Sequence, residues 1–452
     1  MNAPMRGTTG AFLSVTTLFF AWGAITSLID PLVAAVKGIF SLSDLMAQLS
    51  ASAFFIAYGL VSLPAAGLVG RIGPIKAILS ALSLTILGCL TMLGAANLAI
   101  YALVLGGLFI LASGITILQV AANPLAAALG DPGRSHLRLT LSQAFNSFGT
   151  FLGPILGAHL FLKGLEVKPG SVVTDAARKG ALAGIDSAYF WICGLIAALA
   201  VFFLMRRSVI ASALARSETG VTAPQRSLGQ LLGEAMTSRW ALLGGAAIFL
   251  YVGAEVAIGA QMALFLNSDS VWGQSNAPFS VPLVGSLMGS DGVAGVSLQE
   301  AGKAVGLYWG GAMIGRLLGT VLLMRISAPR LLAAATAVAG SMCLYVAFVG
   351  GVSAGFVALS IGLFNSVMFP LIFTLTLERS TASQEATSGF LCTAIVGGAA
   401  IPPFVGLVSG THGYAAALIV PAVCYGLLLL FALAAGRKKP EVAMTPGFAG
   451  GH

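Results

Sequence analysis

Long apolar runs recur along the whole chain, and short segments rich in Gly, Ser, Pro or charged residues separate them. A run of about twenty such residues crosses a hydrocarbon core of about 30 Å as a helix. Membrane strands are shorter and alternate with a period of two, which these runs do not. The pattern therefore predicts about twelve transmembrane helices, at 11–36, 46–70, 75–96, 98–127, 138–162, 185–206, 240–266, 300–323, 329–350, 353–378, 385–408 and 414–436.

The chain also divides near its middle, where a basic and polar stretch runs from Met205 to Trp240. Short motifs repeat across this division: ANPLAAAL around Pro124 resembles MFPLIFTL around Pro370, and GPILG resembles PPFVG at a nearly equal offset. Such a repeat is typical of two parallel halves related by an axis along the membrane normal. We predict an all-α membrane protein with a six-helix bundle at 1–206, a cytoplasmic linker at 207–239 and a second six-helix bundle at 240–452, and this architecture resembles the major facilitator superfamily.

Basic residues lie unevenly when the predicted loops are numbered alternately from the N-terminus. Most of the 23 Lys and Arg fall on the side shared by both termini. Those that fall opposite are Lys37, Lys163, Lys168, Arg178, Lys179 and Lys303. The excess predicts that both termini are cytoplasmic.

Composition supports a membrane protein and excludes several other classes. Hydrophobic residues make up 58% of the chain and charged residues 8%, against roughly 25% charged in a soluble domain. The net charge of +8 follows the loops, so we expect no nucleic-acid partner. The histidines and cysteines show no metal-ligand spacing, and no phosphate loop or nucleophile motif is present, so we predict no metal, no cofactor and no enzymatic activity.

Polar residues inside the predicted spans carry the functional information, because each is costly in hydrocarbon unless it faces protein or a water-filled cavity. Asp30 and Pro31 fall in the outer half of the first span, at an expected helix break. A carboxylate there is a candidate proton or cation carrier, or else the structural partner of a nearby cation.

The fourth and fifth spans carry amides at helical spacing. Gln119 and Asn123 lie on one face, and Pro124 frees a backbone carbonyl one turn earlier. Gln143 and Asn146 follow in the stretch LSQAFNSFG, beside two phenylalanines. Convergent amides and aromatic rings suit an uncharged sugar, and the alternative is that the amides bond neighbouring helices.

The second half contributes fewer polar residues. Asn365, Trp309 and Gln261, with Tyr58 of the first half, are further candidates for sugar contact. Glu255 is a second candidate for cation coupling, and it could instead form a structural ion pair with Arg316 on an adjacent helix, which is the reading that we favour.

A set of motifs, taken together, resembles the fucose/galactose/glucose-proton symporter family, and its glucose/galactose branch in particular. The motifs are HLRLTLSQAFNSFGTFLGPILG, QVAANPL, YVGAEVAIG, YWGGAMIGR, FNSVMFPLIFTLTLE and AIVGGAAIPP, and the resemblance runs from Phe20 to about Gly406. It implies proton-coupled uptake of a monosaccharide by alternating access. We expect the protein in a bacterial inner membrane. The resemblance also matches Asp30 to an acidic residue of the family's first helix, and Gln143 and Asn146 to polar positions that line its sugar cavity.

The chain departs from this family at several positions. The family usually has ETAANP where this chain has QVAANP, so Gln119 replaces a glutamate that is thought to exchange a proton. Coupling would then depend on Asp30 alone, move to Glu255, use sodium or be absent. Gly70 replaces an acidic residue of the cytoplasmic gating motif, and the long 267–299 loop is either a lid or a tolerated insertion.

The sequence thus predicts a sugar symporter that binds a monosaccharide, a co-transported proton or sodium ion and membrane lipid. We expect a monomer, because one chain holds both halves of the path. The alternatives are an uncoupled sugar facilitator, a sodium-coupled symporter and, on the same scaffold, an exporter of non-sugar compounds.

Overall fold

The computed structural model describes residues 3–129, 135–163, 165, 173–217, 228–273 and 295–438, and these residues form helices with no strand among them. The helices, in chain order, are α1 (Ala3–Ser27), α2 (Ile29–Ile39), α3 (Asp44–Ile72), α4 (Pro74–Leu98), α5 (Tyr101–Ala128), α6 (Ser135–Phe161), α7 (Asp175–Ser217), α8 (Leu228–Thr237), α9 (Arg239–Asn267), η2 (Asp269–Gly273), α11 (Leu298–Leu323), α12 (Ala328–Val349), α13 (Gly351–Asn365), α14 (Met368–Arg379), α15 (Gln384–Thr393), η3 (Ala394–Val396), α16 (Gly397–His412), α17 (Tyr414–Ala417) and α18 (Ile419–Arg437).

Eleven helical stretches of the described chain are long and apolar enough to cross a membrane. Helix α6 adds a twelfth element, 27 residues long, at the predicted span 138–162. A helix of that length extends about 40 Å, which is more than a hydrocarbon core needs. The predicted number and kind of transmembrane elements are therefore confirmed.

Four of the predicted spans are interrupted helices, and the twelfth divides at Leu418 into α17 and α18. The first divides at Leu28 into α1 and α2, and the tenth divides at Ser366 and Val367 into α13 and α14. Pro31 and Pro370 each occupy the third position of the helix that follows, where a missing N–H costs no intrahelical bond. The eleventh changes to the 3₁₀ segment η3 between α15 and α16. Helix α5, in contrast, continues through Pro124 to Ala128.

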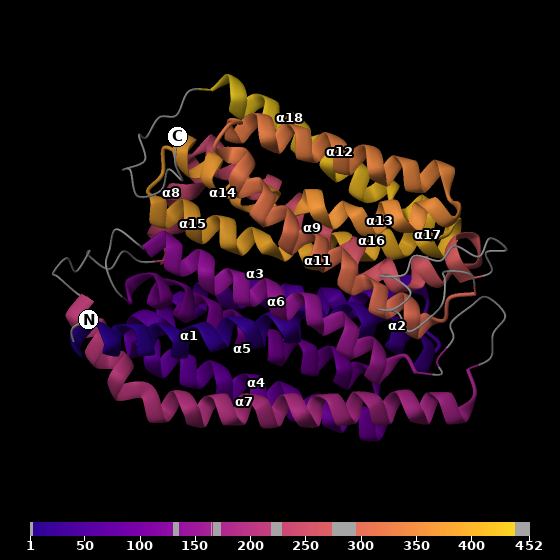
Figure 1. The fold of residues 1–452 in the computed structure, drawn as a ribbon, viewed down its shortest axis with the longest axis horizontal. Coiled ribbons are helices and arrows are strands. Elements are labelled where there is room, and N and C mark those ends of the chain that lie inside the picture. The colour runs from indigo at the N-terminus through magenta and orange to yellow at the C-terminus, as the bar shows by residue number, and fades with distance from the viewer. Residues whose placement is uncertain are drawn as a thin grey trace.

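The helices form two groups that lie one on the other (Figure 1). Helices α1–α7 make the first group, here called the N half, and α9–α18 make the second, the C half. Helix α1 starts and α18 ends at the same end of the bundle (Figure 1). We call this the terminal end, and we call the opposite end, where α2 stops and α11 starts, the far end.

Small residues bring the two halves together. Helix α11 packs on α6, and α16 packs on α3. Gly302 lies against Ala158, and a Cβ at Gly406 would come within 2.8 Å of the Asp44 carbonyl oxygen. Close backbone approach of this kind is how helices associate where lipid removes the usual hydrophobic drive.

The predicted linker at 207–239 contains more helix than its polar composition suggested. Helix α7 continues to Ser217, beyond the predicted end at residue 206, and α8 occupies Leu228–Thr237. Helix α8 packs on α15, where the Glu234 carboxylate accepts hydrogen bonds from the Ser383 backbone N–H at 2.7 Å and from its hydroxyl at 3.0 Å. The second part of this segment is therefore attached to the C half.

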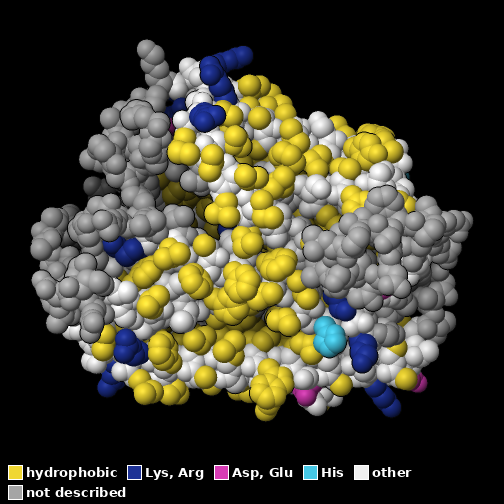
Figure 2. Space-filling model, in the orientation of Figure 1, with side chains coloured by type: hydrophobic (Ala, Val, Ile, Leu, Met, Phe, Trp, Pro, Cys, Tyr) yellow, Lys and Arg dark blue, Asp and Glu magenta, His cyan; other side chains and the backbone are white. Residues whose placement is uncertain are grey.

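The visible surface has a broad apolar band, and Lys and Arg gather toward the two ends of the bundle (Figure 2). This distribution fits a protein with lipid around its middle and water at its ends. The proposed lid at 267–299 lies for the most part outside the described residues, which stop at Gly273 and resume at Gly295. Before the gap, the buried Trp272 donates from Nε1 to the Val352 carbonyl oxygen at 3.0 Å.

Candidate functional site

The break in the first transmembrane helix places Asp30 between the two halves. Asp30 lies in the first turn of α2, where the helix dipole favours a negative charge, and its side chain is 5% exposed. Trp309 of α11 donates from Nε1 to Asp30 Oδ2 at 2.6 Å. A Cβ at Gly259 of α9 would come within 3.2 Å of Asp30 Oδ1, so the glycine leaves room for the carboxylate. Asp30 of the N half therefore depends on the C half for its hydrogen bond.

Gln119 lies beside Tyr58, and its Nε2 donates to the Tyr58 hydroxyl at 2.9 Å. The Tyr58 ring stacks on Phe55, with the ring centroids 5.7 Å apart, and Phe55 packs against Gly398 of the C half. The amide supplies a donor that an ionised glutamate would lack.

The other amides of the N half lie on α5 and α6. Gln143 donates from Nε2 to Asn123 Oδ1 at 3.5 Å, and Asn146 donates from Nδ2 to the Phe19 carbonyl oxygen at 3.1 Å. Gln119, Asn123, Gln143 and Asn146 are each partly exposed. Uncharged donors and acceptors within apolar helices, reachable by a solute, are what a sugar cavity requires.

Asn365 has a different environment. It is fully buried; its Nδ2 donates to the Tyr308 hydroxyl at 2.6 Å, and its Oδ1 accepts from the Tyr425 hydroxyl at 2.6 Å. Tyr308 in turn donates to the Glu255 backbone carbonyl at 3.3 Å. These contacts link α9, α11, α13 and α18, so they favour a packing role for Asn365, and its contact with sugar stays a prediction.

The charged residues Glu255 and Arg316 lie near each other at the centre of the bundle. The Glu255 carboxylate accepts a hydrogen bond from Tyr251 at 2.6 Å and also feels the positive charge of Arg316. Arg316 donates from Nη1 to the hydroxyl of Ser147, a residue of the N half, at 2.7 Å. Arg316 thus lies near Glu255 and also connects the two halves through Ser147. The predicted ion pair did not include this second contact.

Gln261 lies about 9 Å farther along α9 than Glu255, toward the far end. It is 2% exposed, and its Nε2 donates to the Tyr414 carbonyl oxygen at 3.4 Å. Its Oε1 has no hydrogen-bond partner among the described residues. The structure therefore places this candidate beside α17, whereas Gln119, Asn123, Gln143 and Asn146 lie on α5 and α6.

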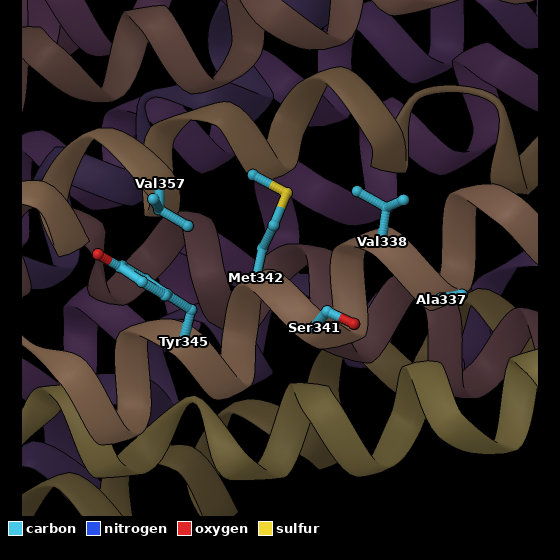
Figure 3. A pocket seen from close by; sticks show the side chains of 6 residues that line it. All are labelled: Ala337, Val338, Ser341, Met342, Tyr345 and Val357. Atoms are coloured by element: carbon cyan, nitrogen blue, oxygen red, sulfur yellow. The ribbon is translucent and has the colours of Figure 1, made fainter.

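A surface groove of about 430 Å³ lies elsewhere, between α12 and α13 (Figure 3). Its lining side chains are Ala337, Val338, Ser341, Met342, Tyr345 and Val357. This lining is mostly apolar and lacks convergent polar groups, so it does not suit a sugar.

Comparisons with known proteins agree with this architecture. The sequence profile of the Major Facilitator Superfamily matches residues 11–382. The chain is 36% identical over 428 residues to a glucose/galactose transporter of Brucella abortus, with 95% of this chain and 94% of the relative covered. It is 29% identical over 434 residues to the L-fucose-proton symporter of Escherichia coli, with coverages of 93% and 92%.

A crystal structure of the Escherichia coli fucose:proton symporter superposes with a TM-score of 0.64 and 25% identity, covering 96% of this chain and 100% of that one. Two helical halves with polar groups between them define an integral membrane transporter. The chain belongs to the major facilitator superfamily and, within it, to the family that includes the Brucella glucose/galactose transporter.

Proposed function

We propose that the protein takes up a monosaccharide of the glucose/galactose type by alternating access, with cation coupling through Asp30. The observation that carries the sugar assignment is the group of four partly exposed amides on α5 and α6, Gln119, Asn123, Gln143 and Asn146. Neutral amides bind hydroxyls without requiring a charge on the cargo. The names of the relatives, glucose/galactose transporter and L-fucose-proton symporter, support the same substrate class.

The proposed cation is a proton, with Asp30 as its carrier. Asp30 is buried at the junction of the halves and is the acidic residue whose contact with Trp309 exists only while α2 and α11 are together. Glu255 is the second candidate, and its bonds to Tyr251 and its proximity to Arg316 favour a structural role. We further propose a bacterial inner-membrane location with cytoplasmic termini, a monomeric chain and surrounding lipid as its other partner.

Uptake into vesicles tests the proposal. Purified protein is reconstituted and supplied with radiolabelled glucose, galactose, fucose or N-acetylglucosamine under a proton gradient, a sodium gradient or neither. We expect accumulation of glucose or galactose above equilibrium when the proton gradient is imposed. If the sugar only equilibrates across the membrane and neither gradient changes its uptake, the protein is a facilitator. That result would follow from Gln119, whose amide cannot exchange a proton. Accumulation only under sodium would identify a sodium symporter.

A triple variant distinguishes a sugar carrier from an exporter of apolar compounds. Asn123→Leu, Gln143→Leu and Asn146→Val together replace three of the four amides. Each lost partner leaves a sugar hydroxyl unpaired, at about 1–3 kcal/mol, so sugar uptake is expected to fall below detection. Unchanged sugar uptake by a folded triple variant would show that these amides of α5 and α6 do not line the sugar cavity.

A further inference from the structure

Three polar side chains meet at the far end of the bundle, where the N half touches the C half. Lys37 is near the end of α2, Asp44 begins α3, and Tyr414 begins α17. The Lys37 ammonium donates to the Asp44 carboxylate and to the Tyr414 hydroxyl. The Tyr414 hydroxyl donates to Asp44 Oδ1 at 3.0 Å. A tyrosine of the C half thus completes an ion pair that belongs wholly to the N half.

The backbone around Tyr414 fixes its direction. Gly413, just before it, has φ +87°, a conformation that glycine adopts without strain and that turns the chain from α16 into α17. The Gln261 amide of α9 donates to the Tyr414 carbonyl oxygen at 3.4 Å. Gly406 lets α16 lie directly on the start of α3 at Asp44. Two independent contacts therefore hold the Tyr414 ring over Lys37, whose Nζ lies 5.2 Å from the ring centroid.

The cluster is shielded from water, so its hydrogen bonds are stronger than exposed ones. The side chains of Lys37 and Asp44 are 14% and 12% exposed. A hydroxyl between two charged groups makes charge-assisted bonds, which are roughly twice as strong as neutral ones. The Tyr414 hydroxyl is both acceptor and donor here, so both bonds depend on how the two halves are placed.

We infer that Tyr414 is the positioning residue of a gate that closes the far end of the transport path, with the Lys37–Asp44 ion pair as its preformed partner. This inference rests on the proposed alternating-access function. When the far end opens, α16 and α17 withdraw from α2 and α3, and the Tyr414 bonds break. The Lys37–Asp44 pair can persist, because both residues move with the N half. Among the hydrogen bonds of this cluster, those of Tyr414 are the ones that join the two halves, so removing its hydroxyl shifts that equilibrium.

Distance measurement between two spin labels tests the gate on the full chain in lipid nanodiscs. Leu45→Cys on α3 and Thr411→Cys on α16 lie at exposed far-end positions on opposite halves, and the five native cysteines are replaced by alanine. Without sugar, labelled protein that keeps Tyr414 is expected to show mainly a short distance between the two labels, which corresponds to a closed far end. Tyr414→Phe should lower the ratio of closed to open molecules by about tenfold or more, because the hydroxyl's bonds to two charged groups are lost.

Tyr345→Phe is the matched control. Its hydroxyl bonds Ser353 Oγ at 2.9 Å, a contact between α12 and α13 within the C half, so its loss should leave the far-end distance unchanged. Lys37→Gln keeps a donor but removes the charge and should shift the ratio in the same direction as Tyr414→Phe. This second variant supports the inference even if Tyr414→Phe does not fold.

Two results would overturn the gate: an unchanged ratio in folded Tyr414→Phe and Lys37→Gln, or an equal shift in Tyr345→Phe. The measurement needs no cargo, so its outcome does not depend on which solute is carried. A vesicle assay that finds no sugar uptake would contradict the proposed function and leave the distance result standing.

Discussion

Asp30 and Trp309 belong to different halves, and their hydrogen bond is a direct link between an ionisable group and the relative position of the halves. We predict that Asp30→Asn abolishes sugar accumulation driven by a proton gradient. The asparagine can still accept from the indole N–H, so packing survives, but it cannot carry a proton. Sugar exchange between the two sides at equal concentrations should continue. The measurement is radiolabelled uptake with and without the gradient, alongside exchange.

Asp186→Asn is the control for this prediction. Asp186 lies on α7, where it accepts from Asn97 Nδ2 at 2.7 Å in an exposed contact far along the chain from Asp30. Its neutralisation should leave gradient-driven uptake intact. If Asp30→Asn still accumulates sugar, proton coupling belongs to another group, of which Glu255 is the next candidate.

The polar candidates within the membrane spans could be identified from the sequence alone, because each one interrupts an apolar run. It could not identify their partners. Trp309 is distant in sequence from Asp30, and the pairing depends on how α2, α9 and α11 meet. Asn365 was predicted as a sugar contact, and its bonds to Tyr308 and Tyr425 became visible only in three dimensions. The contacts of Tyr414 could not be predicted, because in the sequence it is one tyrosine that follows a glycine.

Helix packing in the C half depends on glycines that leave no room for a side chain. A Cβ at Gly362 of α13 would overlap the backbone carbonyl of Tyr308 on α11, and backbone cannot move aside as a side chain can. We predict that Gly362→Ala destabilises the protein by about 1–3 kcal/mol, the usual cost of overpacking. A thermal unfolding scan in detergent should show a lower Tm.

Gly194→Ala on α7 is the matched control for Gly362→Ala. No atom lies within 4 Å of the Cβ position at Gly194, so this substitution should leave Tm unchanged or raise it, because alanine favours helix by about 1 kcal/mol over glycine. An equal drop for both variants would show that the loss of stability does not come from the α11–α13 contact.

The helices themselves were predictable because length and hydrophobicity decide them. Their interruptions were predictable in part: Asp30 and Pro31 indicated a break, which the structure places at Leu28. Pro124 predicted a freed carbonyl, and α5 nevertheless continues past it. The helix within the linker was missed, since its short apolar face is stabilised by docking on α15, a tertiary contact.

At the scale of the whole molecule, the family resemblance stated from the motifs is confirmed by the comparisons. The conformational state could not be predicted, because one sequence serves every state of an alternating-access cycle. In this structure the far end is closed: Tyr414 bonds Lys37 and Asp44, and Gly302 packs on Ala158. We therefore predict that a solute reaches the partly exposed amides from the terminal end.

Thiol labelling from each side of the membrane tests this arrangement. Asn123→Cys, with the native cysteines replaced, is expected to react with a membrane-impermeant maleimide faster from the terminal end than from the far end. With the proposed cytoplasmic termini, the faster reaction occurs in everted vesicles and the slower one in intact cells. Val201→Cys, at a position on α7 that is 58% exposed, is the control; it should stay unlabelled from either side, because a thiol surrounded by lipid does not ionise to the reactive thiolate. Faster labelling of Asn123→Cys in intact cells would mean that the path opens at the far end at rest, which the Tyr414 contacts oppose.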